Sequence, residues 1–541
     1  MKKRVFRILV LLLVCTLLTG CGVDLSRYTD ALYAANGGSS NPDVIPYSEM
    51  VYTRPDMDAL ESLLSNVRTA AAGTDFPKII RHVNALYDAY DEFYTNYSLA
   101  DIRYSSNLSD SYWEAEYSFC MENSPRVDAM LEEMYYALAQ SPCLESLESE
   151  KYYGEGYFDA YQGENNWDAE FTAMLEAESA LIGRYYELAA LGAEYESGSE
   201  AYYDVCFEEM AQVLVELIAL RQEIAAYWGY PNYNLFATDY YYYRDYTLDE
   251  SRAYLDSIRV ELVSLYEKVN RSGIWEYGFS AAGETDTYAY VERMARNMGG
   301  IVEEAFAVMD QGGLYDIGYG ENKYASSFEV YLTSYDEPFI FMCPTMTTYD
   351  YLVFAHEFGH FCNDYASWGN YAGVDVLEVF SQGMEYLSLC YVEDNKQLTK
   401  MKMADSLAMY VEQAAFAAFE MGIYEIPAEE LSVDSLLELY QEVGDSYGFE
   451  SLNYDPREFV TINHYFTNPL YILSYVVSND AAMQLYQLEQ ETPGAGLACF
   501  EENLTTGEYY FLSFLDTAGL ESPFAPGRIQ EVRATFEDIL G

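Results

Sequence analysis

The sequence of 541 residues predicts a mainly α-helical protein with a small β-sheet. Apolar residues recur at helical spacing in long runs such as DALESLLSNVRTAAAG (58–73) and AQVLVELIALRQEIAAYWG (211–229). Two short runs rich in β-branched and aromatic residues, near 326–333 and 338–343, predict strands. Hydrophobic residues make up 50% of the chain, so it is able to bury a large core.

The first twenty residues, 1–20, are expected to be absent from the mature protein. Basic residues precede the apolar run ILVLLLVCTLL, which is too short to span a membrane, and Leu-Thr-Gly-Cys21 follows it. This pattern resembles a bacterial lipoprotein signal, which implies cleavage before Cys21 and lipidation of that cysteine. Residues 21–50 are then expected to be a flexible tether, with the protein exported, lipid-anchored at the cell membrane and facing the extracytoplasmic side.

The composition restricts the partners of the protein. The chain has 89 acidic and 28 basic residues, which give a formal net charge of −61. Such a field repels nucleic acid phosphates and anionic lipid headgroups, so we expect no nucleic acid partner. Tyrosine is frequent, with 57 residues that include the run Tyr240 to Tyr243. Most of these tyrosines are expected to be packing residues, and some are expected to line a peptide channel.

A candidate metal site lies in the run TTYDYLVFAHEFGHFCND. Residues four apart lie on the same face of a helix, so His356 and His360 can present two imidazole nitrogens to one ion, with Glu357 beside them. Thr347 and Asp350 predict a capping box at the start of this helix. The alternative is a buried core helix whose two histidines are satisfied by ordinary hydrogen bonds.

A catalytic zinc takes three protein ligands and leaves one position for water, so a third ligand is needed. The next run, DVLEVFSQGMEYLSLCYV, places Glu378, Ser381 and Glu385 on one helix face. Burying two acids and a serine among apolar neighbours is expensive unless they are paired, and a metal ion is the obvious partner.

HEFGH followed by E-x-x-S-Q-x-x-E resembles the gluzincin zinc oligopeptidases of the thimet oligopeptidase and oligoendopeptidase F family. The resemblance implies one Zn²⁺ per chain, held by His356, His360 and Glu378, with Glu385 orienting a histidine and Ser381 beside the ligands. The commonest family spacing counted from His360 instead points to Glu385, because the loop between the two helices is shorter here. Asn363 stands where many members of the family carry a further histidine.

The segment NHYFTNPLYILSYVV is similar to the C-terminal active-site segment of the same family. The resemblance implies that His464, with Tyr471 or Tyr475, stabilises the negative charge that develops on the carbonyl oxygen during peptide hydrolysis. The residues alone are equally consistent with an aromatic stripe in the core.

The resemblance covers most of the chain from about residue 60 and implies a two-lobed helical metallopeptidase. We expect an N-terminal helical lobe at 51–235, a catalytic lobe at 236–541, a deep substrate channel, and a small sheet beside the zinc helix. The expected activity is hydrolysis of internal bonds of short peptides by a monomer, with zinc-bound water as nucleophile and Glu357 as general base.

Two alternatives remain open. One is a zinc aminopeptidase, although a G-x-M-E-N-like stretch for a free amino group is not found in the sequence. The other is a lipid-anchored peptide-binding or zinc-binding protein without turnover.

Overall fold

The computed structural model describes residues 44–541, apart from residues 150, 164–166, 193–194, 196, 275–279, 370–371, 394 and 450–453. The predicted signal segment 1–20, the lipid-bearing Cys21 and most of the predicted tether lie outside the described residues. In the part of the chain that is described, no helix is both long and apolar enough to cross a membrane.

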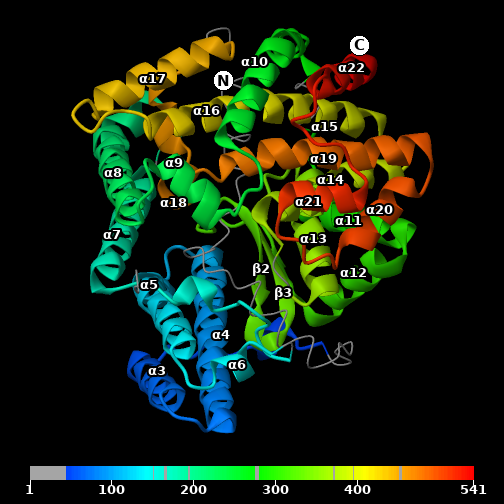
Figure 1. Cartoon of the computed structure of the whole chain (residues 1–541). Coiled ribbons are helices and arrows are strands. Elements are labelled where there is room, and N and C mark those ends of the chain that lie inside the picture. The colour runs from blue at the N-terminus through cyan, green and yellow to red at the C-terminus, as the bar shows by residue number, and fades with distance from the viewer. Residues whose placement is uncertain are drawn as a thin grey trace.

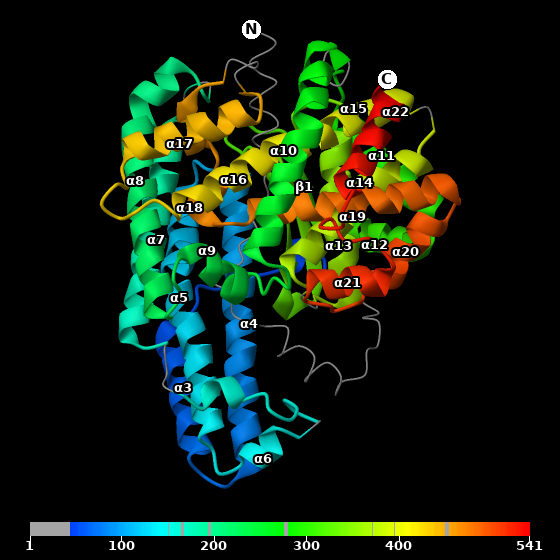
Figure 2. The same cartoon turned by 45° about the horizontal axis from the view of Figure 1, so that its top comes forward.

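The first helices form an elongated bundle that extends away from the rest of the molecule (Figures 1 and 2). They are α3 Met57–Ala71, α4 Phe76–Ser106, α5 Ser111–Ala139 and α6 Leu144–Leu147. The aspartates Asp56, Asp75 and Asp110 precede α3, α4 and α5, and each side chain accepts a hydrogen bond from an N–H group of the first turn. This bundle buries an apolar cluster of its own.

The remaining helices share a second and larger buried cluster. They are α7 Ala169–Gly192, α8 Glu200–Tyr227, α9 Tyr233–Phe236, α10 Leu248–Arg271, α11 Glu284–Met298, α12 Gly300–Gly312, α13 Asp350–Ser367, α14 Val374–Tyr391, α15 Lys396–Ala408, α16 Ala414–Ile423, α17 Val433–Ser446, α18 His464–Thr467, α19 Ile472–Glu491, α20 Ala495–Asn503, α21 Phe511–Ala518 and α22 Arg528–Leu540. Short π-helical turns lie at Ala237–Tyr241 and Met409–Gln413, and 3₁₀ turns at Tyr47–Glu49, Asp159–Tyr161, Thr333–Tyr335 and Pro456–Thr461.

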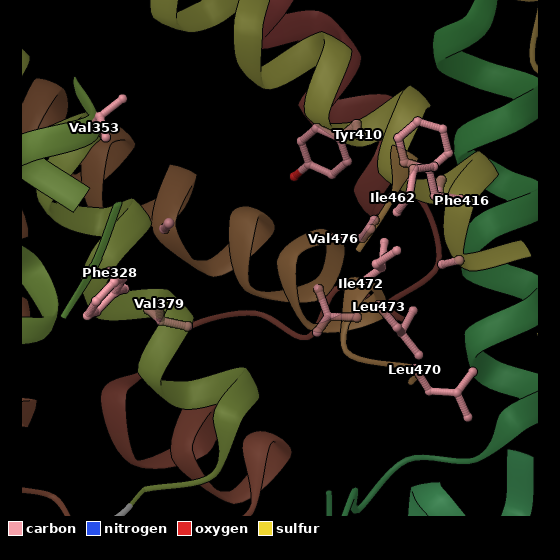
Figure 3. Packing of buried hydrophobic residues seen from close by; sticks show 14 of the residues in the cluster. Phe328, Val353, Val379, Tyr410, Phe416, Ile462, Leu470, Ile472, Leu473 and Val476 are labelled. Atoms are coloured by element: carbon pink, nitrogen blue, oxygen red, sulfur yellow. The ribbon is translucent and has the colours of Figure 1, made fainter. Parts of the chain in front are cut away.

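The larger cluster joins elements that are far apart in the sequence. Figure 3 shows Phe328 from the sheet, Val353 from α13 and Val379 from α14 together with apolar residues of α19. Helices α7 and α8 also contribute to this cluster. The predicted lobe boundary at residue 235 and the deep channel stay predictions.

The sheet of the described region has the strand order β1-β3-β2. Its strands are β1 Tyr315–Ile317, β2 Ser327–Leu332 and β3 Glu337–Met342, with β3 antiparallel to β2 and parallel to β1. Both predicted strands are confirmed, whereas β1 was missed. Strands β2 and β3 pack against α13, so the predicted mainly helical fold with a small sheet beside this helix is confirmed.

Candidate metal centre

Helix α13 carries the HEFGH motif and begins at Asp350. The Asp350 carboxylate accepts hydrogen bonds from the backbone N–H groups of Thr347, at 3.0 Å, and Thr345, at 2.9 Å. The N-cap residue is Tyr349, whose side chain makes no capping bond. The predicted capping box is therefore wrong in part: Asp350 reaches back to Thr347, but Thr347 is not the N-cap.

Helices α13 and α14 lie unusually close where the motif has its glycine. A methyl group built on Gly359 would lie 2.5 Å from the carbonyl oxygen of Phe380 and 2.7 Å from Cα of Ser381. Because glycine has no side chain, the backbone of α13 rests directly on α14 at this point. This close approach brings the histidine face of α13 against the acidic face of α14.

The structure brings His356, His360 and Glu378 together. One ligand atom from each lies within 4.8 Å of the others. Nε2 of His356 is 3.6 Å from Oε2 of Glu378, and Nε2 of His360 is 3.9 Å from Oε1 of the same carboxylate. All three side chains are buried, and Glu357 is buried beside them.

The donor set fits a metal ion. The Nε2 atoms of His356 and His360 are buried and have no hydrogen-bond partner among the described residues. Buried polar atoms are rarely left without a partner, and two imidazoles with one carboxylate are a ligand set that catalytic zinc uses. His356, His360 and Glu378 are therefore a group that could hold a metal ion.

Neighbouring side chains fix the orientation of these three residues. Nδ1 of His356 lies 2.9 Å from Oε1 of Glu385, and Ser381 donates a hydrogen bond of 2.9 Å to Oε2 of Glu378. Because Glu385 accepts a hydrogen bond from Nδ1–H, His356 in its neutral, metal-binding form would carry its lone pair on Nε2, toward the metal position. Lys402 of α15, which is almost fully buried, pairs with the other oxygen of Glu385 at 2.7 Å. Sequence reasoning missed Lys402, whose only local signal was a lysine between Met401 and Met403.

Burial and nearby charges shift the pKa values of the group in different directions. Burial raises the pKa of Glu378. Burial also opposes ionisation of Glu385, but Lys402 and His356 outweigh it and hold the pKa of Glu385 below its usual value. Burial lowers the pKa of His360 well below its usual range. Burial acts in the same direction on His356, but the hydrogen bond to Glu385 and the nearby carboxylates outweigh it and raise the pKa of His356 to about 9.

A second acidic pair that sequence reasoning missed lies near Glu357. Glu329 of β2 is buried, and its pKa is raised far above the usual range by burial and by the carboxyl groups of Asp364 and Glu357. Burial also raises the pKa of Asp364 to about 7. Burial and mutual repulsion therefore favour the protonated form of these two adjacent carboxyl groups.

The predicted C-terminal residues lie against Glu378. The Tyr471 hydroxyl donates a hydrogen bond of 2.7 Å to Oε1 of Glu378. The Tyr475 hydroxyl is 3.4 Å from Nε2 of His464, and the rings of His464 and Tyr471 have centroids 5.5 Å apart. Burial lowers the pKa of His464 to about 3, so its imidazole is neutral. The histidine and both tyrosines therefore form one cluster that touches the candidate metal ligands.

The fold agrees with that of known peptidase structures. Residues 47–166 match the model of the Peptidase M3 N-terminal domain. A protein described as oligoendopeptidase F is 21% identical with a TM-score of 0.78, covering 92% of this chain and 98% of that chain. PZ peptidase A, solved with an inhibitor, is 19% identical with a TM-score of 0.78 and covers 91% of this chain and 98% of that chain.

The chain has the fold of oligoendopeptidase F structures. A further example, described as an oligoendopeptidase F from Bacillus anthracis strain Ames, is 20% identical with a TM-score of 0.77, covering 92% of this chain and 98% of that chain. No curated protein sequence matches the chain. The oligoendopeptidase F fold is therefore established by structural likeness, at identities that do not by themselves carry over an activity.

Proposed function

We propose that this protein is a zinc-dependent oligoendopeptidase that hydrolyses internal bonds of short peptides outside the cytoplasm. The observation that carries the proposal is the buried group of His356, His360 and Glu378, with Glu357 next to the first histidine. The match of residues 47–166 to a Peptidase M3 N-terminal domain and the shared fold support the same reaction class.

His356, His360 and Glu378 would hold the zinc ion, and Glu385 and Ser381 would keep two of these ligands oriented. A zinc ion in such a site acidifies water and polarises a carbonyl group. Glu357 takes the proton of the attacking water and passes it to the leaving amine.

The cluster of His464, Tyr471 and Tyr475 supplies hydrogen-bond donors beside Glu378. In the proposed reaction a phenol hydroxyl turns from its present acceptor toward the negatively charged oxygen of the tetrahedral intermediate. The neutral imidazole of His464 accepts or donates without adding a charge to this buried region.

We further propose that the protein acts as a lipid-anchored monomer, held at the membrane through Cys21 and without a nucleic acid partner. The lipoprotein-like leader and the net charge of −61 support this part. Replacing Cys21 by serine should release the protein from membranes into the soluble fraction.

The reaction is tested with a peptide blocked by N-terminal acetylation. The wild-type protein, loaded with zinc, is incubated with the blocked peptide and with its free form, and products are identified by mass spectrometry. Internal cuts in both peptides support the proposal. Degradation of only the free peptide would indicate a zinc aminopeptidase, and binding without any cut would indicate a peptide-binding protein.

A further inference from the structure

The turn between α18 and α19 is held by buried charged side chains from distant parts of the chain. Leu470 in this turn has φ 65°, a left-handed conformation that leucine rarely adopts. Its N–H group donates a hydrogen bond of 2.7 Å to Oε1 of Glu420, and its carbonyl oxygen accepts one of 2.9 Å from Arg244. Both polar groups of one strained residue are therefore fixed by ionisable side chains.

Arg244 makes several other contacts from a side chain that is only 1% exposed. Its guanidinium donates to Oγ of Ser474 at 2.9 Å and lies 3.5 Å from a carboxylate oxygen of Asp375. It also lies over the ring of Tyr242, 4.3 Å from the centroid, and the Tyr242 hydroxyl donates 2.7 Å to the carbonyl of Pro469. The end of the tyrosine run thus packs directly on the turn.

The segment that delivers Arg244 is itself strained. It follows the π-helical turn Ala237–Tyr241, and Tyr243 has φ 45°. A non-glycine residue in this region is strained and persists only where the surroundings impose the conformation. Two such residues meet at one buried contact: Tyr243 directly precedes Arg244, and Leu470 accepts the hydrogen bond from Arg244.

Arg244 contacts residues close in sequence to both partners of the hydrogen bond between Tyr471 and Glu378. Leu470 directly precedes Tyr471, whose hydroxyl donates to Glu378. Asp375 lies in the first turn of α14, three residues before Glu378. Arg244 therefore connects the segment that carries the tyrosine to the helix that carries the carboxylate.

We propose that Arg244 is a positioning residue that fixes Tyr471 against Glu378 by joining the strained Leu470 turn to the start of α14. The inference rests on the proposed function, because it assigns a task to Arg244 within that site. It implies that loss of Arg244 weakens zinc binding through Tyr471 and not through general loosening of the fold.

The test is a double-mutant cycle on zinc affinity, measured by competition with a chromogenic chelator. Arg244→Gln and Tyr471→Phe are each expected to weaken zinc binding about tenfold, the usual effect of losing a side chain that orients a metal ligand. The double variant is expected to lose about tenfold as well, because both changes remove the same interaction. A loss near a hundredfold in the double variant, or no loss in Arg244→Gln, overturns the proposal.

The matched control is Arg528→Gln. Arg528 is another buried arginine bound to α19, through Asp480 at 2.9 Å, but its partner is remote from Tyr471 in the helix. This variant is expected to lower stability while leaving zinc affinity unchanged. An equal loss of zinc affinity in Arg528→Gln would show that any loosening of α19 has the same effect and would overturn the proposal.

Tyr242→Phe keeps the test decisive if Arg244→Gln does not fold. This change removes the hydrogen bond to Pro469 and keeps the ring beneath Arg244. A loss of zinc affinity smaller than the tenfold expected for Arg244→Gln is expected, and an unchanged affinity contradicts the proposal. Because the titration needs no hydrolysis, a wild-type chain that binds zinc but cuts no peptide refutes the reaction alone. A wild-type chain that binds no zinc refutes both proposals.

Discussion

Replacing Gly359 by alanine tests whether the contact between α13 and α14 sets the metal site. The added methyl group would lie 2.5 Å from the carbonyl oxygen of Phe380 and 2.7 Å from Cα of Ser381. Favourable contacts between such atoms lie near 3.5–4.0 Å, so the helices must separate by roughly 1 Å. Both contacted atoms belong to the backbone of α14, so a side-chain rotation does not relieve the clash.

Two opposing effects determine the change in stability. Alanine is favoured over glycine inside a helix by about 1 kcal/mol, whereas overpacking a core contact costs about 1–3 kcal/mol. The net destabilisation is therefore at most about 2 kcal/mol. The effect on zinc is larger, since ligand distances in zinc sites vary by only about 0.2 Å and a shift of roughly 1 Å moves Glu378 away from both histidines. We expect zinc affinity to fall by more than tenfold.

The assay combines chelator competition for zinc affinity with denaturant unfolding for stability. Gly183→Ala in α7 is the control, because its methyl group would meet only the end of the Met121 side chain, at an ordinary 3.4 Å. This control is expected to gain about 0.5–1 kcal/mol and to bind zinc normally. Wild-type zinc affinity in Gly359→Ala would refute the argument that the close helix contact brings the ligands together.

Three further predictions concern individual carboxylates. Glu357→Gln should keep zinc bound while kcat falls about 10²–10⁴-fold, and full activity measured in a peptide assay would exclude Glu357 as the base. Glu385→Gln should weaken zinc binding about 10–100-fold in chelator titrations, because His356 loses a charged hydrogen-bond acceptor and Lys402 loses its buried ion-pair partner. An unchanged zinc affinity would show that Glu385 does not orient His356 for metal binding. Asp128 is buried in the N-terminal bundle, and burial raises its pKa to about 7, so the stability it contributes is complete at low pH and is lost as the pH rises through 7. Asp128→Asn should therefore gain stability over the wild type between pH 4 and pH 8, by up to about 4 kcal/mol for a shift of about three pKa units, and a pH-independent difference in denaturant midpoints would contradict this.

The arrangement within single helices could be predicted from the sequence. His356 and His360, or Glu378 and Glu385, share a face because helix geometry alone sets the spacing of residues four or seven apart. The cost of burying unpaired acids indicated a metal partner for the acidic face, and the family resemblance then assigned Glu378 as the third ligand. The roles of these residues in metal binding and catalysis stay predictions until they are measured.

Contacts between distant segments could not be predicted in this way. Strand β1 pairs in parallel with β3, and its three residues carry too little pattern to be recognised alone. The contact of Lys402 with Glu385 depends on how α15 packs against α14, and no spacing in the sequence records it. The capping box was wrong in part because a Thr-x-x-Asp pattern does not determine which of its two reciprocal bonds forms.

Buried arginine and lysine side chains mark positions on which the fold depends, and local sequence patterns do not show which cations are buried. The chain has only 28 basic residues against 89 acidic ones, and a surface position would cost each of them little. Burying a charge costs several kcal/mol unless it is well paired, so each buried cation indicates where the fold needs one. Arg221 binds the carbonyl oxygens of Tyr465 and Phe466, beside His464, while Arg244 and Lys402 hold the surroundings of Tyr471 and His356. In so acidic a protein, these cations mark the segments whose positions the candidate site depends on, and their removal should affect zinc binding and turnover more than their distance from the ligands suggests.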